Sequence, residues 1–572
     1  MNDLSRRDVP PQPTFAELFA PKLLTVLREG YSLAAFRADA VAGLTVAIVA
    51  LPLSMAISIA CGLSPDRGLY TAIIGGFLIS AFGGSRFQIG GPAGAFIVLI
   101  ATIVEKHGYD GLVLATAMAG IVMMVVGFLR LGTYIKYIPF PVTVGFTTGI
   151  AVIIFTSQIK ELLGLDIAKE PAAFVPKLAT IWAALPSFQP ATIAVAAIAI
   201  AIILGLRKYR PTWPGLLIAV VASAALAKLA GLDVATIGTR FGGVPSTLPA
   251  PHLPAFSLAK AQAVFPDALA IALLGAIESL LSAVVADGMS GRRHRSNCEL
   301  VAQGGANVAS VMFGGIPVTG TIARTATNVR AGAHGPVSGM LHALYLLIFM
   351  LLAAPLAAYI PLAALGGVLA IVSWNMAEKH EFATLLKSSR GDAVVLLSTF
   401  LLTVFEDLTL GIAVGVTLGA FLFLHRMAEA VEVEGGGAMV ARDEADGPTR
   451  DRVAYEGPQG HGETVVYRLR GAFFFGATST VISTLDRMGQ LPRVFVFDFS
   501  AVPIADTTAA KSLEAFARKL AKNGTILIIA GANPSVRRTL LQSGLREPEV
   551  HYATSVEAAQ AMLREGESFT AA

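Results

Sequence analysis

Long apolar runs recur in this chain from residue 41 to residue 430. The hydrocarbon core of a bilayer is about 30 Å thick, which a helix of about 20 apolar residues can cross. Only helices and closed barrels satisfy all backbone hydrogen bonds inside a membrane. Because 14% of the residues are charged, against about 25% in an average soluble chain, this region is predicted to be an α-helical polytopic membrane domain.

Charged residues and breaks rich in Pro or Gly divide this region into about fourteen predicted membrane segments. Their approximate limits are 41–61, 68–83, 90–105, 111–131, 138–159, 190–206, 213–231, 266–287, 297–313, 321–333, 337–359, 362–377, 392–410 and 412–429. Basic residues fall mainly in alternate connections, among them Arg37, Arg86, Arg130 and Arg426. Because cytoplasmic loops are enriched in Lys and Arg, we expect a multi-pass protein of a bacterial inner membrane with both termini in the cytoplasm.

The remaining composition excludes several classes of protein. Residues 1–36 are a polar segment without the apolar stretch of a signal peptide, so a cytoplasmic N-terminal segment is expected. Two cysteines, Cys61 and Cys298, make neither a disulfide framework nor a cysteine-rich metal site, and no metal is expected. A net charge of +4 does not indicate a nucleic-acid partner.

The end of the chain has a different character. Residues 431–463 are charged and Gly-rich, so they are predicted to link the membrane domain, residues 37–430, to a soluble domain, residues 464–572. The predicted strands are 464–469, 493–499 and 525–530, and the predicted helices are 507–522, 534–545 and 555–563. Such alternation is typical of a small α/β domain.

Two segments interrupted by Gly and Pro occupy matching positions in the two halves of the membrane domain. Phe82-Gly83-Gly84 precedes the first, residues 88–95, and Phe313-Gly314-Gly315 precedes the second, residues 316–325, and the second tripeptide begins 231 positions after the first. This offset predicts a seven-plus-seven inverted repeat. Transporter sites often lie where the broken helices of such repeats meet near the midplane of the membrane.

The chemistry of these two segments favours an anion. A half-helix that begins inside the membrane leaves about four backbone N–H groups unpaired, and with the helix dipole these groups bind anions. Thr321 and Thr325 add hydroxyl donors and Arg324 adds positive charge. Glu278, in the middle of an apolar segment, is a candidate for proton coupling, since a desolvated carboxyl holds its proton more readily. Two alternatives are that the Gly and Pro residues only permit close helix packing and that Glu278 and Arg324 form a structural ion pair.

Several motifs occur in one order along the chain, among them Ile89-Gly90-Gly91-Pro92, Ala276-Ile277-Glu278-Ser279 and Ala323-Arg324-Thr325-Ala326-Thr327-Asn328. In these motifs the chain resembles the sulfate permease (SulP) family of anion transporters. The resemblance implies fourteen segments in two inverted repeats, a core and a gate subdomain, elevator-like movement and a homodimer. The implied anion site comprises Gly91, Pro92, Ala93, Gly94, Thr321, Ala323, Arg324 and Thr325, with Pro52, Ser54 and Glu278 in its walls.

Within that family, residues 51–56, 84–87 and 374–376 most resemble bacterial members that take up C4-dicarboxylates with protons. Sodium-coupled bicarbonate carriers are expected to have an Asp near the position of Glu278, so the resemblance favours H⁺ over Na⁺ as the coupling ion. Sulfate or a related oxyanion remains an alternative cargo, since these carriers share one scaffold. No cofactor is expected.

Residues 471–475, 498–502 and 506–509 resemble a STAS domain. Antagonists of anti-sigma factors carry an Asp-Ser-Ser-Gly turn with a phosphorylated second serine, whose place Thr508 takes here. Ala509 replaces the Gly of that turn. Thr508 is therefore a candidate phosphosite, and the alternative is that Thr507 or Thr508 caps the helix. The resemblance implies a regulatory or docking role with a cytoplasmic protein partner.

The expected function is secondary active, proton-coupled transport of small anions. A bicarbonate transporter or anion exchanger, an anion channel, and a sensor that signals through the soluble domain are the alternatives. The sequence has no P-loop motif, and no nucleophile–base pair or cofactor loop indicates an enzyme.

Overall fold

A computed structural model describes residues 14–167, 170–171, 173–210, 213–254, 256–429, 432–434, 464–475 and 492–564. The chain divides into two compact units, Met1–Val416 and Thr417–Ala572, and each is described by itself. The predicted linker, residues 431–463, lies outside the described residues except for 432–434, which form a strand that was not predicted.

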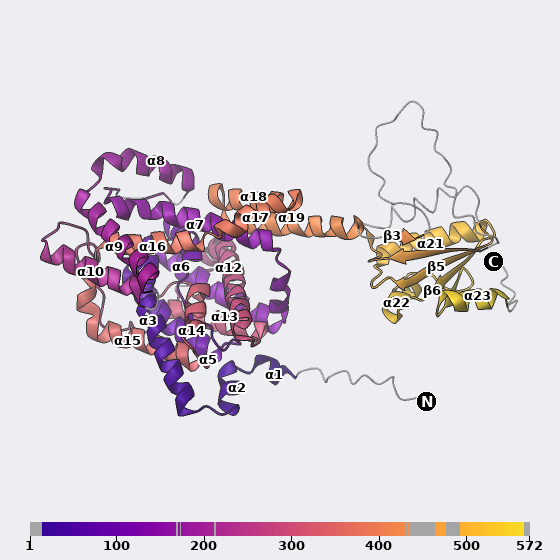
Figure 1. Cartoon of the computed structure of the whole chain (residues 1–572), viewed down its shortest axis with the longest axis horizontal. Helices are drawn as coiled ribbons and strands as arrows, with labels where there is room; N and C mark the ends of the chain where they lie inside the picture. Colours follow the sequence, from indigo (N-terminus) through magenta and orange to yellow (C-terminus); the bar gives the residue numbers. More distant parts are fainter. Residues whose placement is uncertain are drawn as a thin grey trace. The chain divides into compact units, whose positions relative to one another are not determined.

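The first unit is helical apart from two short strands (Figure 1). In chain order, its elements and the helix that leaves it are α1 (Phe15–Phe19), α2 (Lys22–Arg28), α3 (Leu33–Ala60), α4 (Pro65–Tyr70), η1 (Thr71–Gly75), α5 (Gly76–Phe82), β1 (Gly90–Gly91), η2 (Gly94–Phe96), α6 (Ile97–Phe128), η3 (Leu131–Tyr137), α7 (Phe140–Leu163), α8 (Phe174–Ala184), η4 (Leu185–Ser187), α9 (Pro190–Tyr209), α10 (Gly215–Leu229), α11 (Ile237–Phe241), α12 (Leu258–Ser290), α13 (Ser296–Met312), β2 (Thr319–Gly320), α14 (Ile322–Arg330), α15 (Val337–Ala357), α16 (Leu362–Met376), α17 (Lys379–Ser388), α18 (Arg390–Phe405) and α19 (Leu408–Glu429).

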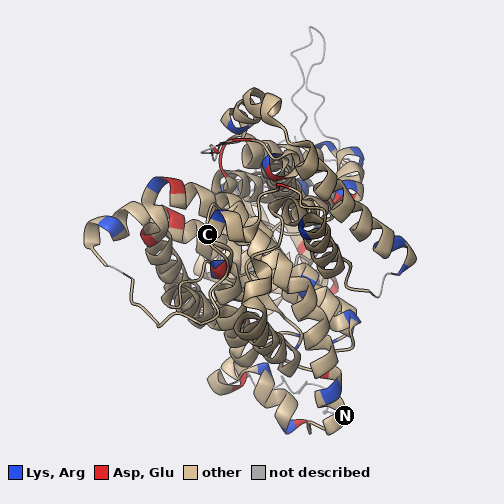
Figure 2. Ribbon diagram, turned by 90° about the vertical axis from the view of Figure 1, so that its left-hand side faces the viewer, with Lys and Arg blue, Asp and Glu red and all other residues tan. Residues whose placement is uncertain are grey.

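The predicted membrane segments all fall on helices of the described chain, and the prediction of a polytopic helical domain is confirmed. Seven helices in the described ranges are long and apolar enough to cross a bilayer by themselves. The third and fourth predicted segments run together in α6, with a break at Gly108, where φ is 68°. Short helices such as α8 and α17, with 11 and 10 residues, were not predicted, because they are too short to cross a bilayer. Figure 2 shows long stretches of helix that carry no charged residue.

The helices of the first unit pack in two groups. In one group, α6 packs against α12 and α13, and α3 packs against α15. In the other, α7 packs against α16 and α18, and α9 packs against α10 and α16. Gly120 and Gly304 let α6 and α13 approach closely, since a Cβ on either glycine would lie within 2.5 Å of the other's carbonyl oxygen. These groups are called the core and the gate below.

The second unit contains a sheet with the strand order β3-β4-β5-β6-β7, in which β3 is antiparallel to β4 and the other neighbours are parallel. Its elements are β3 (Glu432–Glu434), β4 (Thr464–Arg470), β5 (Val494–Ala501), α21 (Thr507–Lys522), β6 (Ile526–Ala530), α22 (Pro534–Gln542), β7 (Val550–Ala553) and α23 (Val556–Arg564). Phe495 and Phe497 on one face of the sheet pack with Leu513 and Phe516 of α21. The α/β prediction is confirmed, although β7 was missed.

The residue that caps the start of α21 differs from the one expected from the sequence. Asp506 is the N-cap, and its side chain accepts a hydrogen bond from the N–H of Ala509 at 2.7 Å. The interpretation of Thr507 or Thr508 as the cap is therefore wrong, because both already lie in the first turn of the helix. Thr508 is exposed, and its phosphorylation stays a prediction.

Candidate functional site

Strands β1 and β2 bring the two halves of the repeat together inside the core. They pair antiparallel, with Gly90 opposite Gly320 and Gly91 opposite Thr319. Each strand leads directly into a helix start, so the beginnings of η2 and α14 lie on either side of this crossing. The two Gly- and Pro-interrupted segments found in the sequence are thus neighbours in space.

Neither helix start has a side-chain cap. Ala93 is the N-cap of η2 and Thr321 is the N-cap of α14, and neither side chain accepts a hydrogen bond from the first turn. The first N–H groups of such helices have no intrahelical partner. Together with the two helix dipoles, these N–H groups provide a positive potential that suits an anion.

Arg324 is buried beside these two helix starts. Its side chain is 1% exposed, and Nη2 donates to Ser54 Oγ at 3.2 Å and to the carbonyl oxygen of Pro92 at 3.4 Å. Nε and Nη1 have no hydrogen-bond partner among the described residues. Burying a charge without a partner is costly, so these two nitrogens indicate a place for a negatively charged ligand.

A cavity of about 600 Å³ adjoins Arg324 and the two helix starts. Of the predicted site residues, the cavity is lined by Pro92, Ala93, Gly94, Thr321, Ala323, Arg324 and Glu278. Most of the other lining side chains are apolar, such as Leu53, Ile57 and Leu369. A mostly apolar pocket with a few convergent polar groups is typical of a binding site for a small molecule.

The other predicted residues lie behind the cavity wall. Gly91 faces the guanidinium, and a Cβ at this position would lie 1.9 Å from Nη1 of Arg324. The hydroxyl of Thr325 accepts hydrogen bonds from the N–H of Ile89 at 3.1 Å and from Ser282 Oγ at 3.0 Å. Pro52 is buried inside α3. These residues support the site but do not line the cavity.

Glu278 reaches the cavity edge. It is 8% exposed, and within the described part of the chain it has no hydrogen bond or ion pair, with Arg324 or with any other residue. The sequence alternative of a Glu278–Arg324 ion pair is therefore not found in this structure. Glu278 is an unpartnered acid between the core and the gate.

Sequence analysis missed the part of the cavity that the gate contributes. Thr147, Arg207, Trp213, Asn375 and Glu378 line it, and Arg207 Nη1 donates to Asn375 Oδ1 at 2.8 Å. Arg207 directly follows the predicted membrane segment 190–206, where a basic residue indicates only the orientation of the segment. The Trp-Asn-Met motif at 374–376 was a signal for Asn375, although not for its position in the cavity.

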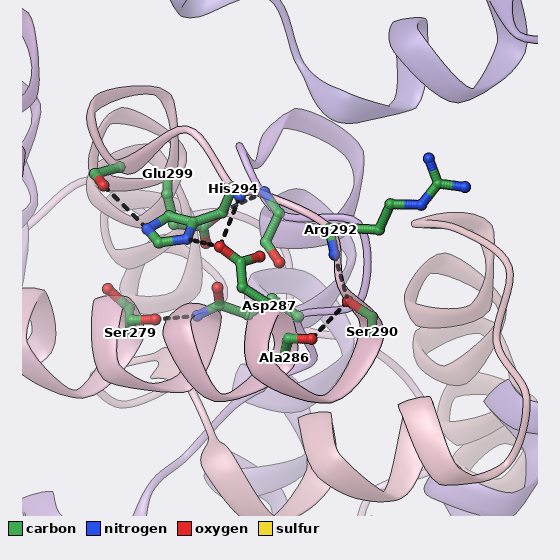
Figure 3. A network of polar contacts seen from close by, with 10 residues as sticks. Ser279, Ala286, Asp287, Ser290, Arg292, His294 and Glu299 are labelled. Atoms are coloured by element: carbon green, nitrogen blue, oxygen red, sulfur yellow. Dashed lines mark hydrogen bonds and ion pairs between the residues drawn. The ribbon is translucent and has the colours of Figure 1, made fainter.

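A second polar network closes the turn between α12 and α13 (Figure 3). Asp287 Oδ2 accepts from the N–H of His294 at 3.0 Å and lies 2.6 Å from Nδ1 of the same residue. Ser290 Oγ donates to the carbonyl of Ala286 at 2.6 Å and accepts from the N–H of Arg292 at 3.3 Å. None of these residues lines the cavity, and their hydrogen bonds fix the turn.

Known protein families match both parts of the chain. A model described as "Sulfate permease family" matches residues 36–399, and one described as "STAS domain" matches residues 456–559. The "Putative sulfate transporter YvdB" of Bacillus subtilis is 40% identical over 519 residues, which are 90% of this chain and 95% of that protein. The "Bicarbonate transporter BicA" of a Picosynechococcus species is 30% identical, over 88% of this chain and 90% of that protein.

Solved structures show a similar fold. The murine Solute Carrier 26 family member A9 anion transporter in its inward-facing state has a TM-score of 0.82 at 18% identity, covering 98% of this chain and 97% of the other. The transmembrane domain of a cyanobacterial BicA has a TM-score of 0.61 at 31% identity, covering 66% of this chain and 98% of the other.

Proposed function

Because the chain belongs to the sulfate permease family, we propose that it is a secondary active transporter of small anions, with sulfate or a related oxyanion as its cargo. A C4-dicarboxylate and bicarbonate are the other candidates. The observation that carries the proposal is the buried guanidinium of Arg324, with two unpartnered nitrogens between two uncapped helix starts.

The donors of the site suit a small oxyanion. Backbone N–H groups at helix starts and a guanidinium replace the water that surrounds an oxyanion in solution. The relative from Bacillus subtilis is named a putative sulfate transporter, which supports sulfate as the first anion to test. The name of BicA supports bicarbonate as the second.

The position of the cavity supports alternating access. It lies between the core and the gate, and it extends to Arg207, Asn375 and Glu378. Arg207 belongs to a cluster of basic residues at the end of α9, and the positive-inside rule assigns such a cluster to the cytoplasm. An elevator-like displacement of the core against the gate would move the anion without rebuilding its site. We propose this movement, in a homodimer whose STAS domain serves regulation or docking.

Glu278 is the proposed proton-coupling residue. It borders the cavity without a partner among the described residues, and a carboxyl group inside a membrane is costly and usually marks a substrate or ion pathway. A proton on Glu278 would offset the negative charge that the anion brings into the core. Inward movement of both is then favoured by an inward proton gradient.

Uptake into proteoliposomes tests the proposal. Radiolabelled sulfate, succinate and bicarbonate are offered with imposed proton or sodium gradients to the wild type and to Glu278→Gln. We expect one anion to accumulate under an inward proton gradient, and Glu278→Gln to bind it without accumulation. Glu381→Gln is a control, since that side chain is 49% exposed on α17.

The other outcomes separate the alternatives. Accumulation by Glu278→Gln equal to that of the wild type would show that Glu278 does not couple transport. Accumulation driven by sodium would favour the bicarbonate-carrier alternative. Saturable binding without flux of any of the three anions would favour a sensor.

A further inference from the structure

Two backbone hydrogen bonds hold the chain in the same way just ahead of the two interrupted segments. The N–H of Lys22 donates to the carbonyl oxygen of Gly83 at 2.9 Å, and the N–H of His252 donates to that of Met312 at 2.8 Å. The second donor lies 230 positions after the first donor, and the second acceptor lies 229 positions after the first acceptor. The Phe-Gly-Gly tripeptides are offset by 231 positions. The two hydrogen bonds therefore occupy equivalent places in the two repeats.

The sequence before each donor supports this equivalence. Ala20-Pro21 precedes Lys22, and Ala250-Pro251 precedes His252. Proline has no N–H, so in each case the donor is the first N–H after the proline. Residues 20–22 ahead of α3 are thus the counterpart of residues 250–252 ahead of α12, and the first repeat begins before its first membrane segment.

An arginine of the second repeat holds the Gly-Gly loop of the first, residues 83–84. The N–H of Arg295 donates to the carbonyl oxygen of Gly84 at 2.9 Å, and its Nη1 donates to the carbonyl oxygen of Ala20 at 2.7 Å. Nη1 and Nη2 also donate to Thr25 Oγ1 at 3.3 Å and 3.4 Å. Arg295 therefore ties this loop to the segment that precedes α3.

An arginine of the first repeat holds the Gly-Gly loop of the second, residues 314–315. Nη1 of Arg67 donates to the carbonyl oxygen of Gly314 at 3.2 Å. The guanidinium lies over the ring of Tyr109, 3.4 Å from its centroid, and the Tyr109 hydroxyl donates to the carbonyl oxygen of Gly315 at 2.8 Å. Arg295 follows Arg67 by 228 positions, so the two arginines are counterparts as well.

The two Gly-Gly loops lead into the crossing of β1 with β2 from opposite directions. The first loop precedes β1, the second precedes β2, and the two strands pair antiparallel. A shift of either loop along its strand would move Gly90 relative to Gly320, and with them the two helix starts. Each strand has only two residues, so the pairing itself offers little resistance to such a shift. Contacts outside the crossing therefore help to fix its register.

We propose that Arg67 and Arg295 are paired positioning residues for the proposed anion site, an inference that rests on the proposed function. Each arginine holds the Gly-Gly loop of the opposite repeat, and the two loops together set the register of β1 with β2. The helix starts at Ala93 and Thr321 then keep the spacing that one small oxyanion needs. Loss of either arginine releases one loop, and the crossing then shifts although the other loop is still held.

Sulfate binding to the full-length protein in lipid nanodiscs tests this inference. Arg67→Gln and Arg295→Gln should each weaken binding about tenfold, because each loses hydrogen bonds from a charged group. The double variant should bind within about threefold of either single variant, because the same register is lost in all three. Two independent losses at sites without shared contacts would instead combine to about a hundredfold. The double variant thus distinguishes a shared positioning role from two separate effects on stability.

Milder variants test the same point if a Gln variant does not fold. Tyr109→Phe keeps the ring under Arg67 but removes the hydrogen bond to Gly315, and Thr25→Val removes one acceptor of Arg295. We expect about threefold weaker binding in each variant, and about threefold in the two combined, rather than the product of the two losses.

Two exposed basic residues serve as matched controls. Arg28 lies three residues after Thr25, and Lys106 lies three residues before Tyr109. Arg28→Gln and Lys106→Gln remove the same kind of charge near each loop without removing a contact that holds it. Both variants should bind sulfate as the wild type does.

Wild-type affinity in either Arg67→Gln or Arg295→Gln would overturn the inference. A loss of about a hundredfold or more in the double variant, or a multiplicative loss in the combined milder variants, would overturn it as well. These results leave the transporter proposal standing, which fails if the wild type binds sulfate without flux. A wild type that binds no sulfate would overturn both proposals in their sulfate form.

Discussion

A methyl group on Gly91 would lie 1.9 Å from Nη1 of Arg324. Gly91 is held in β1 opposite Thr319 of β2, so its backbone cannot move without disturbing the crossing of the two repeats. The missing side chain leaves the space that the guanidinium occupies. The glycine therefore acts on the proposed anion site through Arg324.

Gly91→Ala is expected to displace the guanidinium from its position beside the helix starts. Loss of a hydrogen bond to a charged group costs about 1.5–3 kcal/mol, so sulfate should bind about tenfold more weakly or worse. Equilibrium binding to the purified protein is the measurement. Gly305→Ala is the control, since a Cβ there meets no atom within 4 Å. Wild-type affinity in Gly91→Ala would contradict this role.

Thr325→Val is expected to destabilise the core more than it weakens anion binding. The substitution keeps the shape of the side chain but leaves the buried N–H of Ile89 without its acceptor. Such a loss costs about 1–3 kcal/mol and should lower the thermal unfolding temperature. Thr102→Val is the control, because that hydroxyl bonds only the carbonyl of Val98 in its own helix. Unchanged stability with abolished binding would instead make Thr325 a direct ligand.

Asp506→Ala is expected to destabilise the soluble domain. Asp506 accepts hydrogen bonds from the N–H groups of Ala509 and Phe475, and loss of an N-cap costs about 0.5–2 kcal/mol. Chemical unfolding of a fragment of residues 432–572 measures the change. Thr508→Ala should change the free energy of unfolding by about 0.5 kcal/mol or less. Equal losses in both variants would restore Thr508 as a capping residue.

The soluble domain should lose stability in acid partly through Asp498. Burial disfavours its charge, but hydrogen bonds from Ser500 and Arg468 outweigh burial and hold the pKa of Asp498 below its usual range. The folded state thus binds this proton more weakly than the unfolded state. The resulting stability is present above the usual range of an Asp, about pH 4, and is lost as the pH falls through the lower folded value.

Urea unfolding of the same fragment at about pH 7 and about pH 3 checks this expectation, since these values bracket the range of a carboxyl. Asp498→Asn should be less stable than the wild type at the higher pH and should lose less stability on acidification. An equal loss in both proteins would assign the acid sensitivity to other groups.

The sequence by itself determined the membrane domain, the repeat and the two interrupted segments of the proposed anion site. Each apolar segment has to satisfy its backbone hydrogen bonds within one helix in lipid, so the pattern is local and can be read without knowledge of the fold. The same holds for the interruptions at 88–95 and 316–325, and for Arg324 and Glu278 amid apolar residues. Short strands at the domain edge, such as β7, carry a weaker local signal and were missed.

Only the tertiary structure decided which of these residues face the cavity. It placed Thr325 and Gly91 behind the wall and gave half of the lining to gate residues such as Arg207 and Asn375. These relations join helices far apart in the chain. They depend on side-chain packing and on the crossing of β1 with β2, and periodicity along one segment does not encode either.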